Sequence, residues 1–179
     1  MGNFSLKFDK FWETFIKYNG YVKVLEGLKN TLTIAVLGLI IGIVIGTLIA
    51  TARVIPQYKV LPRILNKICS FYVALFRGTP IVVQLLVFYY VLLPLMGSRM
   101  TGIQVAVMVF GLNSAAYISE IMRGGIMSVD SGQMEAGRAV GLSFGTTMLK
   151  IVIPQAVKNI LPTMGNELIA LIKDTSVVI

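Results

Sequence analysis

Residues 31–52, which lie within the longest stretch of chain without a charged residue, constrain the fold more than any other feature of the sequence. A helix rises about 1.5 Å per residue, so a helix over this stretch is long enough to cross the hydrocarbon core of a bilayer, which is roughly 30 Å thick. Two further uncharged runs cover residues 78–98 and 100–119. Of the 179 residues 56% are hydrophobic and only 13% are charged, which a soluble domain would not tolerate. The sequence therefore predicts an all-α, polytopic bundle of transmembrane helices.

We expect four spans in this chain. They cover residues 31–52, about 64–96, about 102–122 and about 153–173. Gly78 and Pro80 predict a local break or kink in the second span. The fourth span is marginal by hydropathy because charged residues interrupt it, and Pro154 and Pro162 interrupt it further.

Gly38, Gly42 and Gly46 recur every four residues within the first expected span. Residues four apart lie on the same face of a helix. Small residues on such a face let a second helix approach closely, which is how helices gain packing energy in lipid. The spacing predicts a helix-packing face, and hence a bundle rather than a lone anchor.

The segments on both sides of the first span carry positive charge. Residues 53–67 contain four basic and no acidic residues, together with Pro56 and Pro62, a composition typical of a cytoplasmic loop. The first 30 residues carry five lysines against three acids, so charge alone only modestly favours a first span that runs from outside to inside.

Aromatic residues recur at helical spacing near the N-terminus, among lysines on other faces. They are Phe4, Phe8, Phe11, Trp12 and Phe15. We expect residues 1–26 to form an amphipathic segment that lies in the bilayer interface. An ordinary aromatic belt beside the membrane is the alternative.

The sequence contains no histidine and a single cysteine, Cys69. The commonest catalytic base and metal ligand is therefore missing, and neither a Walker-type phosphate loop nor a serine–base arrangement is found. We expect no catalytic site, no metal site and no cofactor bound by this chain. The net charge of +8 comes from basic residues that flank apolar runs, so we interpret it as contact with membrane lipid and not with nucleic acid.

A polar stretch between the third and fourth expected spans, residues 124–152 and the positions just after it, carries a spaced motif. It resembles the signature of ABC importer permeases, written E-A-A, three residues, G, nine residues, I-x-L-P. The matching positions are Glu135, Ala136, Gly141, Ile151 and Pro154. The sequence departs from the signature at Gly137, where alanine is usual, and at Ile153, where leucine is usual.

The resemblance implies a transmembrane permease domain over residues 27–179, with residues 124–152 as its cytoplasmic coupling region. A short helix there would dock into a cleft of a separate ATPase subunit, which binds ATP and magnesium, and pass its closing motion to the bundle. Small residues at 136, 137 and 141 suit a closely gripped helix, and Gly141 suits a turn that a side chain would block. Pro154 suits the start of the returning helix. The alternative is a helix–turn–helix that only connects two spans.

Three further strings resemble the permeases for polar amino acids (the histidine, arginine, glutamine and glutamate group): residues 76–80 with Gln84, residues 116–125 and residues 173–176. This resemblance covers nearly the whole chain from about Gly27 and implies a multi-pass protein of the bacterial inner (plasma) membrane. The implied partners are an ATPase subunit, a second permease subunit, identical or homologous, and an extracytoplasmic amino acid-binding protein. Relatives usually continue into one more span, so we expect five spans in the intact protein and a sequence that is truncated after Ile179.

Charged residues at membrane depth cost about 2.5 to 3.5 kcal/mol on insertion scales and therefore indicate function. Glu167 and Asp174 are seven residues apart, which places them within about 20° of each other on one helix face, and Thr163 shares that face. We expect this face to bind the α-ammonium or a cationic side chain of an amino acid, which suits arginine, lysine or histidine better than glutamate. Arg77 could instead meet a substrate carboxylate or pair with Glu167, and Asp174 could lie at the outer interface beside Lys173.

Glu120 and Arg123, near the inner end of the third expected span, are interpreted as a gate or structural pair. The rival class for the whole chain is a secondary transporter or channel that needs no ATPase. Such proteins typically show inverted repeats or intramembrane ion ligands, and the sequence contains no internal repeat. We therefore predict the permease subunit of an ATP-driven importer for polar amino acids, which is not itself an enzyme.

Overall fold

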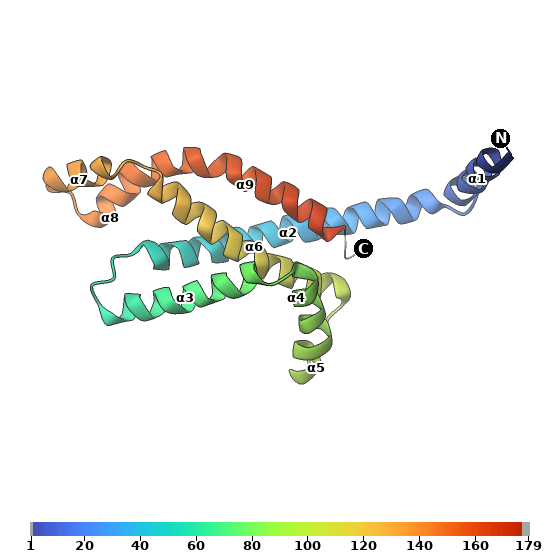
Figure 1. Cartoon of the computed structure of the whole chain (residues 1–179), viewed down its shortest axis with the longest axis horizontal. Coiled ribbons are helices and arrows are strands. Elements are labelled where there is room, and N and C mark those ends of the chain that lie inside the picture. Colours follow the sequence, from blue (N-terminus) through green and yellow to red (C-terminus); the bar gives the residue numbers. More distant parts are fainter. Residues whose placement is uncertain (1, 177–179) are drawn as a thin grey trace.

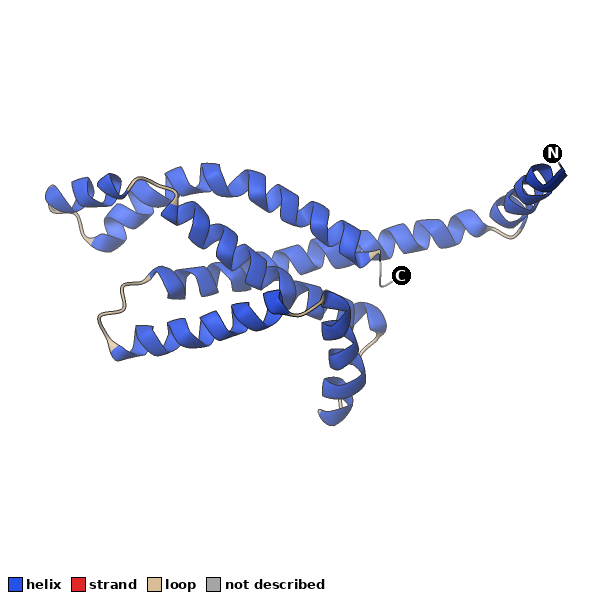
Figure 2. Cartoon of the chain, viewed as in Figure 1, coloured by secondary structure: helices blue, strands red, loops and turns tan. Residues whose placement is uncertain are grey.

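The computed structural model describes residues 2–176, and every regular element in that range is a helix (Figure 1, Figure 2). In chain order the elements are α1 (Gly2–Trp12), the π-helical η1 (Glu13–Lys17), α2 (Gly20–Val54), α3 (Val60–Gly78), α4 (Ile81–Val87), the π-helical η2 (Phe88–Leu92), α5 (Leu93–Leu95), α6 (Gly102–Met127), α7 (Ser131–Ala139), α8 (Phe144–Thr147), the π-helical η3 (Met148–Val152) and α9 (Ile153–Thr175). The predicted all-α class is confirmed.

Helices α2 and α6 pack against each other and form the centre of the bundle. Gly38, Gly42 and Gly46 are buried on the face of α2 that meets α6. A Cβ atom at Gly42 would lie 2.7 Å from the Ser114 Oγ atom, and one at Gly46 would lie 2.9 Å from the Ala115 backbone oxygen. No real Cβ contact is that short, so the two backbones approach closely only because these positions lack a side chain.

Helix α9 packs on the same central pair and runs above it in the view of Figure 1, whereas α3 runs below it. Ile34 of α2, Phe110 of α6 and Leu171 of α9 meet in one buried apolar cluster. At Gly125 of α6 an added Cβ would lie 2.2 Å from the Cγ1 atom of Ile160 in α9. This second close approach depends on a glycine that no regular spacing marks in the sequence.

A sharp bend separates α3 from α4. Thr79 and Pro80 have extended backbone between the two helices, and the helical arms on either side meet at 106°. Pro80 cannot continue α3, because it lacks the N–H group of a helical residue and its ring crowds the preceding turn. The expected break is present, and it is sharp enough that residues 60–95 do not form one straight crossing.

Pro94 and Pro154 each follow a π-helical turn, η2 and η3. A proline has no N–H group to donate to the carbonyl four residues earlier, and its ring clashes with that carbonyl. The wider turn of a π-helix relieves this clash. Pro154 does lie in the first turn of α9, but the chain is already helical from Phe144, so the returning helix begins before the proline. Pro162 lies inside α9 and does not interrupt it.

Within residues 2–176, α2 and α6 are each long and apolar enough to cross a membrane, and the bent pair of α3 with α4–α5 makes a third span if it is counted as one. Helix α9 does not meet the same criterion, because charged residues lower its hydropathy. They are Lys158, Glu167, Lys173 and Asp174. Two or three of the four expected spans therefore pass on length and hydropathy.

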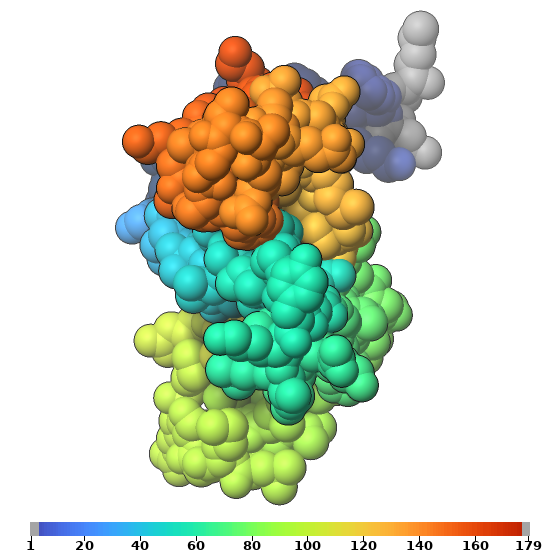
Figure 3. Space-filling view, turned by 90° about the vertical axis from the view of Figure 1, so that its left-hand side faces the viewer, coloured from blue at the N-terminus to red at the C-terminus, as the bar shows by residue number. Residues whose placement is uncertain are grey.

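Different segments of the chain lie at the two ends of the bundle. The segment formed by α1 and η1 extends beyond the bundle at the N-terminal end of α2 (Figure 1), after a turn in which Asn19 has a φ of 54°. The connection between α2 and α3 lies at the other end, together with α7 and α8 (Figure 3). The two segments that the sequence predicts to be cytoplasmic are therefore at the same end, which we call the α7–α8 end.

Candidate substrate cavity and coupling helix

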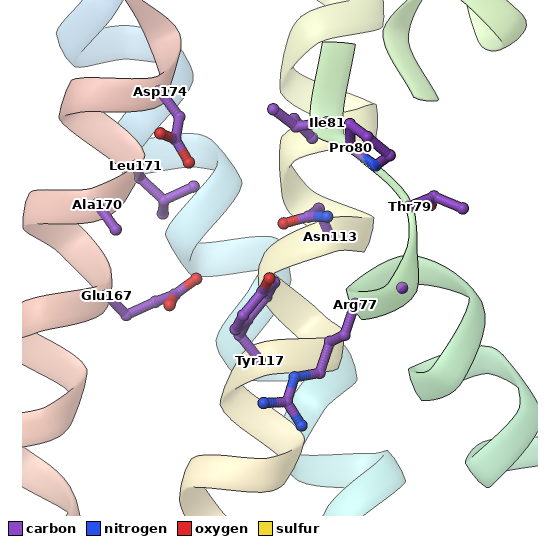
Figure 4. Close-up of a pocket in the computed structure, with 11 residues that line it drawn as sticks. Arg77, Thr79, Pro80, Ile81, Asn113, Tyr117, Glu167, Ala170, Leu171 and Asp174 are labelled. Atoms are coloured by element: carbon purple, nitrogen blue, oxygen red, sulfur yellow. The ribbon is translucent and has the colours of Figure 1, made fainter. Parts of the chain in front are cut away.

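A cavity of about 480 Å³ lies between α9, α6 and the break that separates α3 from α4 (Figure 4). Its lining residues are Glu167, Ala170, Leu171 and Asp174 from α9, Asn113 and Tyr117 from α6, and Arg77, Gly78, Thr79, Pro80 and Ile81 from the break. A volume of this size is typical of sites for small molecules. Three of the four residues predicted to contact substrate, Glu167, Asp174 and Arg77, are brought to one cavity.

The two carboxylates form the α9 wall of the cavity. Glu167 is partly buried and accepts a hydrogen bond of 3.0 Å from the Ser114 hydroxyl, while Asp174 is exposed two turns further along the helix. Among residues 2–176 neither carboxylate forms an ion pair with a basic side chain, so the alternative pairing of Glu167 with Arg77 is not formed. Thr163 does not line the cavity, because the α9 wall ends at Glu167, one turn before Thr163 is reached.

Arg77 stacks on an aromatic ring and does not point at the carboxylates. Its guanidinium carbon lies 5.1 Å from the centroid of the Tyr117 ring, a cation–π arrangement. In Figure 4 this guanidinium lies beyond Tyr117 on the side away from Asp174. The cavity therefore has negative groups along one wall and a positive group toward one end.

Asn113 and Tyr117 line the cavity from α6. The sequence places both on one face of that helix, but sequence reasoning gave neither a role. Their spacing of four residues in a mostly apolar span is the signal that could have found them.

Glu120 lies in a cluster with two arginines, not one. Arg123 donates to the Glu120 Oε2 atom from Nε at 3.1 Å and from Nη2 at 2.9 Å, and Arg53 donates to Oε1 through Nη1. The sequence identified Arg53, at the end of α2, only as one of the basic residues of a predicted cytoplasmic loop. The structure brings its side chain into a partly buried network on α6 that does not line the cavity.

The predicted coupling residues are on α7 and the turn after it. Glu135 and Ala136 are exposed, whereas Gly137 is buried and a Cβ there would lie 2.4 Å from the Thr147 Cγ2 atom. Gly141 has a φ of +85°, and the Leu142 N–H group donates to the Gly137 carbonyl at 3.0 Å, which closes the helix end. Contact with α8 therefore explains why glycine replaces the usual alanine at position 137.

The sequence profile of the family described as "Binding-protein-dependent transport system inner membrane component" matches residues 38–179. The chain is 42% identical over 155 residues to the arginine transport system permease protein ArtQ of Bacillus subtilis, which covers 87% of this chain and 68% of that protein. It is 41% identical over 157 residues to the glutamine transport system permease protein GlnP of Escherichia coli K12, which covers 87% of this chain and 69% of that protein. The crystal structure of an amino acid ABC transporter with histidines superposes with a TM-score of 0.81 at 36% identity and covers 92% of this chain and 74% of that one.

The chain belongs to the family of inner-membrane components of binding-protein-dependent transport systems. It is the permease component of an ABC transporter, a multi-pass protein of the inner membrane. Family membership implies a separate ATPase subunit, which binds ATP and magnesium, and a binding protein as partners. The rival interpretation, a secondary transporter or channel without an ATPase, is thereby set aside.

Proposed function

We propose that this chain provides the translocation path of an importer for polar amino acids, and that the cavity between α9, α6 and the α3–α4 break holds the substrate during passage. The observation that carries the proposal is the α9 wall, where Glu167 and Asp174 face the cavity without a basic partner among the described residues. Charged groups at membrane depth are expensive unless a partner or function retains them. A substrate ammonium or guanidinium group is the missing partner.

The charge of the cavity favours cationic amino acids over acidic ones. Two carboxylates suit the α-ammonium group together with the side chain of arginine, lysine or histidine, whereas a glutamate side chain would be repelled. Arg77, toward one end of the cavity, is placed to attract the α-carboxylate. The two relatives described above are an arginine and a glutamine permease protein, and their similar identities leave the substrate to be decided by the site itself.

Titration calorimetry on the assembled transporter tests this proposal. Glu167→Gln and Asp174→Asn keep the size of each side chain and remove its charge, so each should weaken arginine binding about tenfold to a hundredfold, as expected for a lost charged hydrogen bond. Glu26→Gln, an exposed position on α2 outside the cavity, makes the same chemical change and should leave binding unaltered. Unchanged affinity in both cavity variants would refute the proposed site.

The proposed function also assigns α7 a role, as the helix that docks to the ATPase subunit. Glu135 and Ala136 lie on the exposed side of a short helix at the α7–α8 end, where a cytoplasmic ATPase subunit could grip them. A second permease subunit, identical or homologous, would complete the path, and an extracytoplasmic amino acid-binding protein would deliver substrate at the opposite end.

A further inference from the structure

The proline in the α3–α4 break leaves one particular carbonyl group without its helical partner. In an uninterrupted helix the N–H group of residue 80 would donate to the carbonyl of Phe76, four residues earlier. Pro80 has no N–H group, and Phe76 is buried, so its carbonyl needs another donor.

The side chain of Gln84 supplies that donor. One hydrogen of its Nε2 atom is donated to the Phe76 carbonyl at 2.8 Å, and the other is shared between the Thr79 carbonyl at 3.0 Å and the Thr79 hydroxyl at 2.8 Å. The Thr79 hydroxyl in turn donates to the Leu75 carbonyl at 2.8 Å, and the Gln84 backbone N–H group donates to the Pro80 carbonyl at 3.1 Å. Gln84 is 7% exposed and does not line the cavity, yet it ties together both sides of the break.

The same network fixes the orientation of Asn113. The Nδ2 atom of Asn113 donates to the Phe76 carbonyl at 3.2 Å and to the Gln84 Oε1 atom at 3.1 Å. Both of its amide hydrogens are therefore used on the side of the break. Its oxygen points the other way, toward α9, and no donor within residues 2–176 bonds to it (Figure 4). Without this network the amide could turn over and present its donor to the cavity.

We propose that Gln84 is a positioning residue for substrate recognition: its Oε1 atom accepts one Asn113 hydrogen, and the Phe76 carbonyl, which Gln84 also binds, accepts the other, so that Asn113 presents a hydrogen-bond acceptor to the cavity. Glu167, Asp174 and the Asn113 oxygen then form an acceptor-only surface that selects substrates rich in N–H donors, such as guanidinium and ammonium groups. This inference rests on the proposed substrate cavity and adds to it a residue that never touches the substrate.

A double-variant cycle on the complete transporter in proteoliposomes tests the inference. Gln84→Met keeps the length and bulk of the side chain and removes its hydrogen bonds, while Asn113→Ala removes the acceptor. Each should raise the KM for arginine about tenfold, and the double variant should raise it no further than either single variant, because Gln84 acts through Asn113. In Gln84→Met, which leaves the cavity lining itself unaltered, the maximal rate of substrate-stimulated ATP hydrolysis should stay within about twofold of the unaltered protein.

Effects on KM that multiply in the double variant would overturn the inference, since they would show that Gln84 acts independently of Asn113. An unchanged KM in Gln84→Met would overturn it as well. If Gln84→Met does not accumulate in the membrane, Gln84→Leu replaces it in the cycle, because leucine can neither accept from Asn113 nor donate to the Phe76 carbonyl. If the cavity does not bind substrate, Glu167→Gln and Asp174→Asn will leave the arginine affinity unaltered. That result tests the proposed cavity and is distinct from the test of Gln84.

Discussion

Single residues set the distance between α2 and α6. At Gly42 an added Cβ would lie 2.7 Å from the oxygen of Ser114, which donates to Glu167. Gly42→Ala should therefore separate the helices slightly and cost about 1 to 3 kcal/mol of stability. Gly165→Ala in α9 is the matched control, because no residue of the described part of the chain contacts its added Cβ within 4 Å and alanine favours helix. Thermal unfolding in detergent measures both, and equal melting temperatures would contradict the tight packing.

The cluster around Glu120 gives a second test at this scale. The side chains of Arg53 and Glu120 are only 13% and 18% exposed, so Glu120→Gln leaves two arginines near each other without their shared counter-charge. We expect a loss on the order of 3 kcal/mol of stability. The exposed pair of Lys17 with Glu13 offers a control, since Glu13→Gln should change stability by less than about 0.5 kcal/mol. Equal effects of the two substitutions, measured by unfolding in detergent, would rule out a structural role for the buried cluster.

At the scale of helices, sequence patterns predicted the features that depend only on residues close to one another in the chain. Uncharged length predicted α2 and α6, and the Gly–Thr–Pro string predicted the break after α3. The angle of that break, and the π-helical turns before Pro94 and Pro154, depend on how each proline is accommodated by contacts that no periodicity encodes. Helix α9 was foreseen by position and motif more than by hydropathy, because the charged and amide side chains along it make it too polar to pass as a span.

The exposed face of α7 supports a prediction about assembly. Reversing the charge of Glu135 with Glu135→Arg should reduce the amount of ATPase subunit that co-purifies with the permease about tenfold, because the change lies on the surface proposed to dock. Arginine affinity of the permease cavity should be retained. Glu26→Arg makes the same charge change beyond the opposite end of the bundle, and it should leave ATPase binding intact. Equal recovery of ATPase with both variants would argue against docking through α7.

At the scale of the whole molecule, the candidate site joins three segments that are distant in sequence. The seven-residue spacing of Glu167 and Asp174 was enough to place both on one wall, since it depends only on helix geometry. The opposite wall could not be predicted in the same way. Asn113 acquires its orientation from Gln84 and from the carbonyl that Pro80 leaves free, and those contacts exist only once α3, α4 and α6 have packed together.

Orientation in the membrane is also a property of the whole molecule. The structure adds to the prediction from charge by showing which segments lie at the same end of the bundle. The basic connection from Arg53 to Lys67 lies at the same end as α7 and α8, while the N-terminal lysines, partly balanced by acids, lie at the other. Because cytoplasmic loops carry the excess of positive charge, the α7–α8 end should face the cytosol.

Single cysteines introduced into a Cys69→Ser background test this orientation with a membrane-impermeant maleimide. Glu135→Cys, on exposed α7, should react only in inside-out vesicles, and Lys10→Cys, on exposed α1, only in intact spheroplasts. Labelling of both positions from one side would contradict the separation of the two ends. Reaction of Glu135→Cys from outside would place α7 beyond the reach of a cytoplasmic ATPase and so remove the coupling role that connects nucleotide hydrolysis to the cavity.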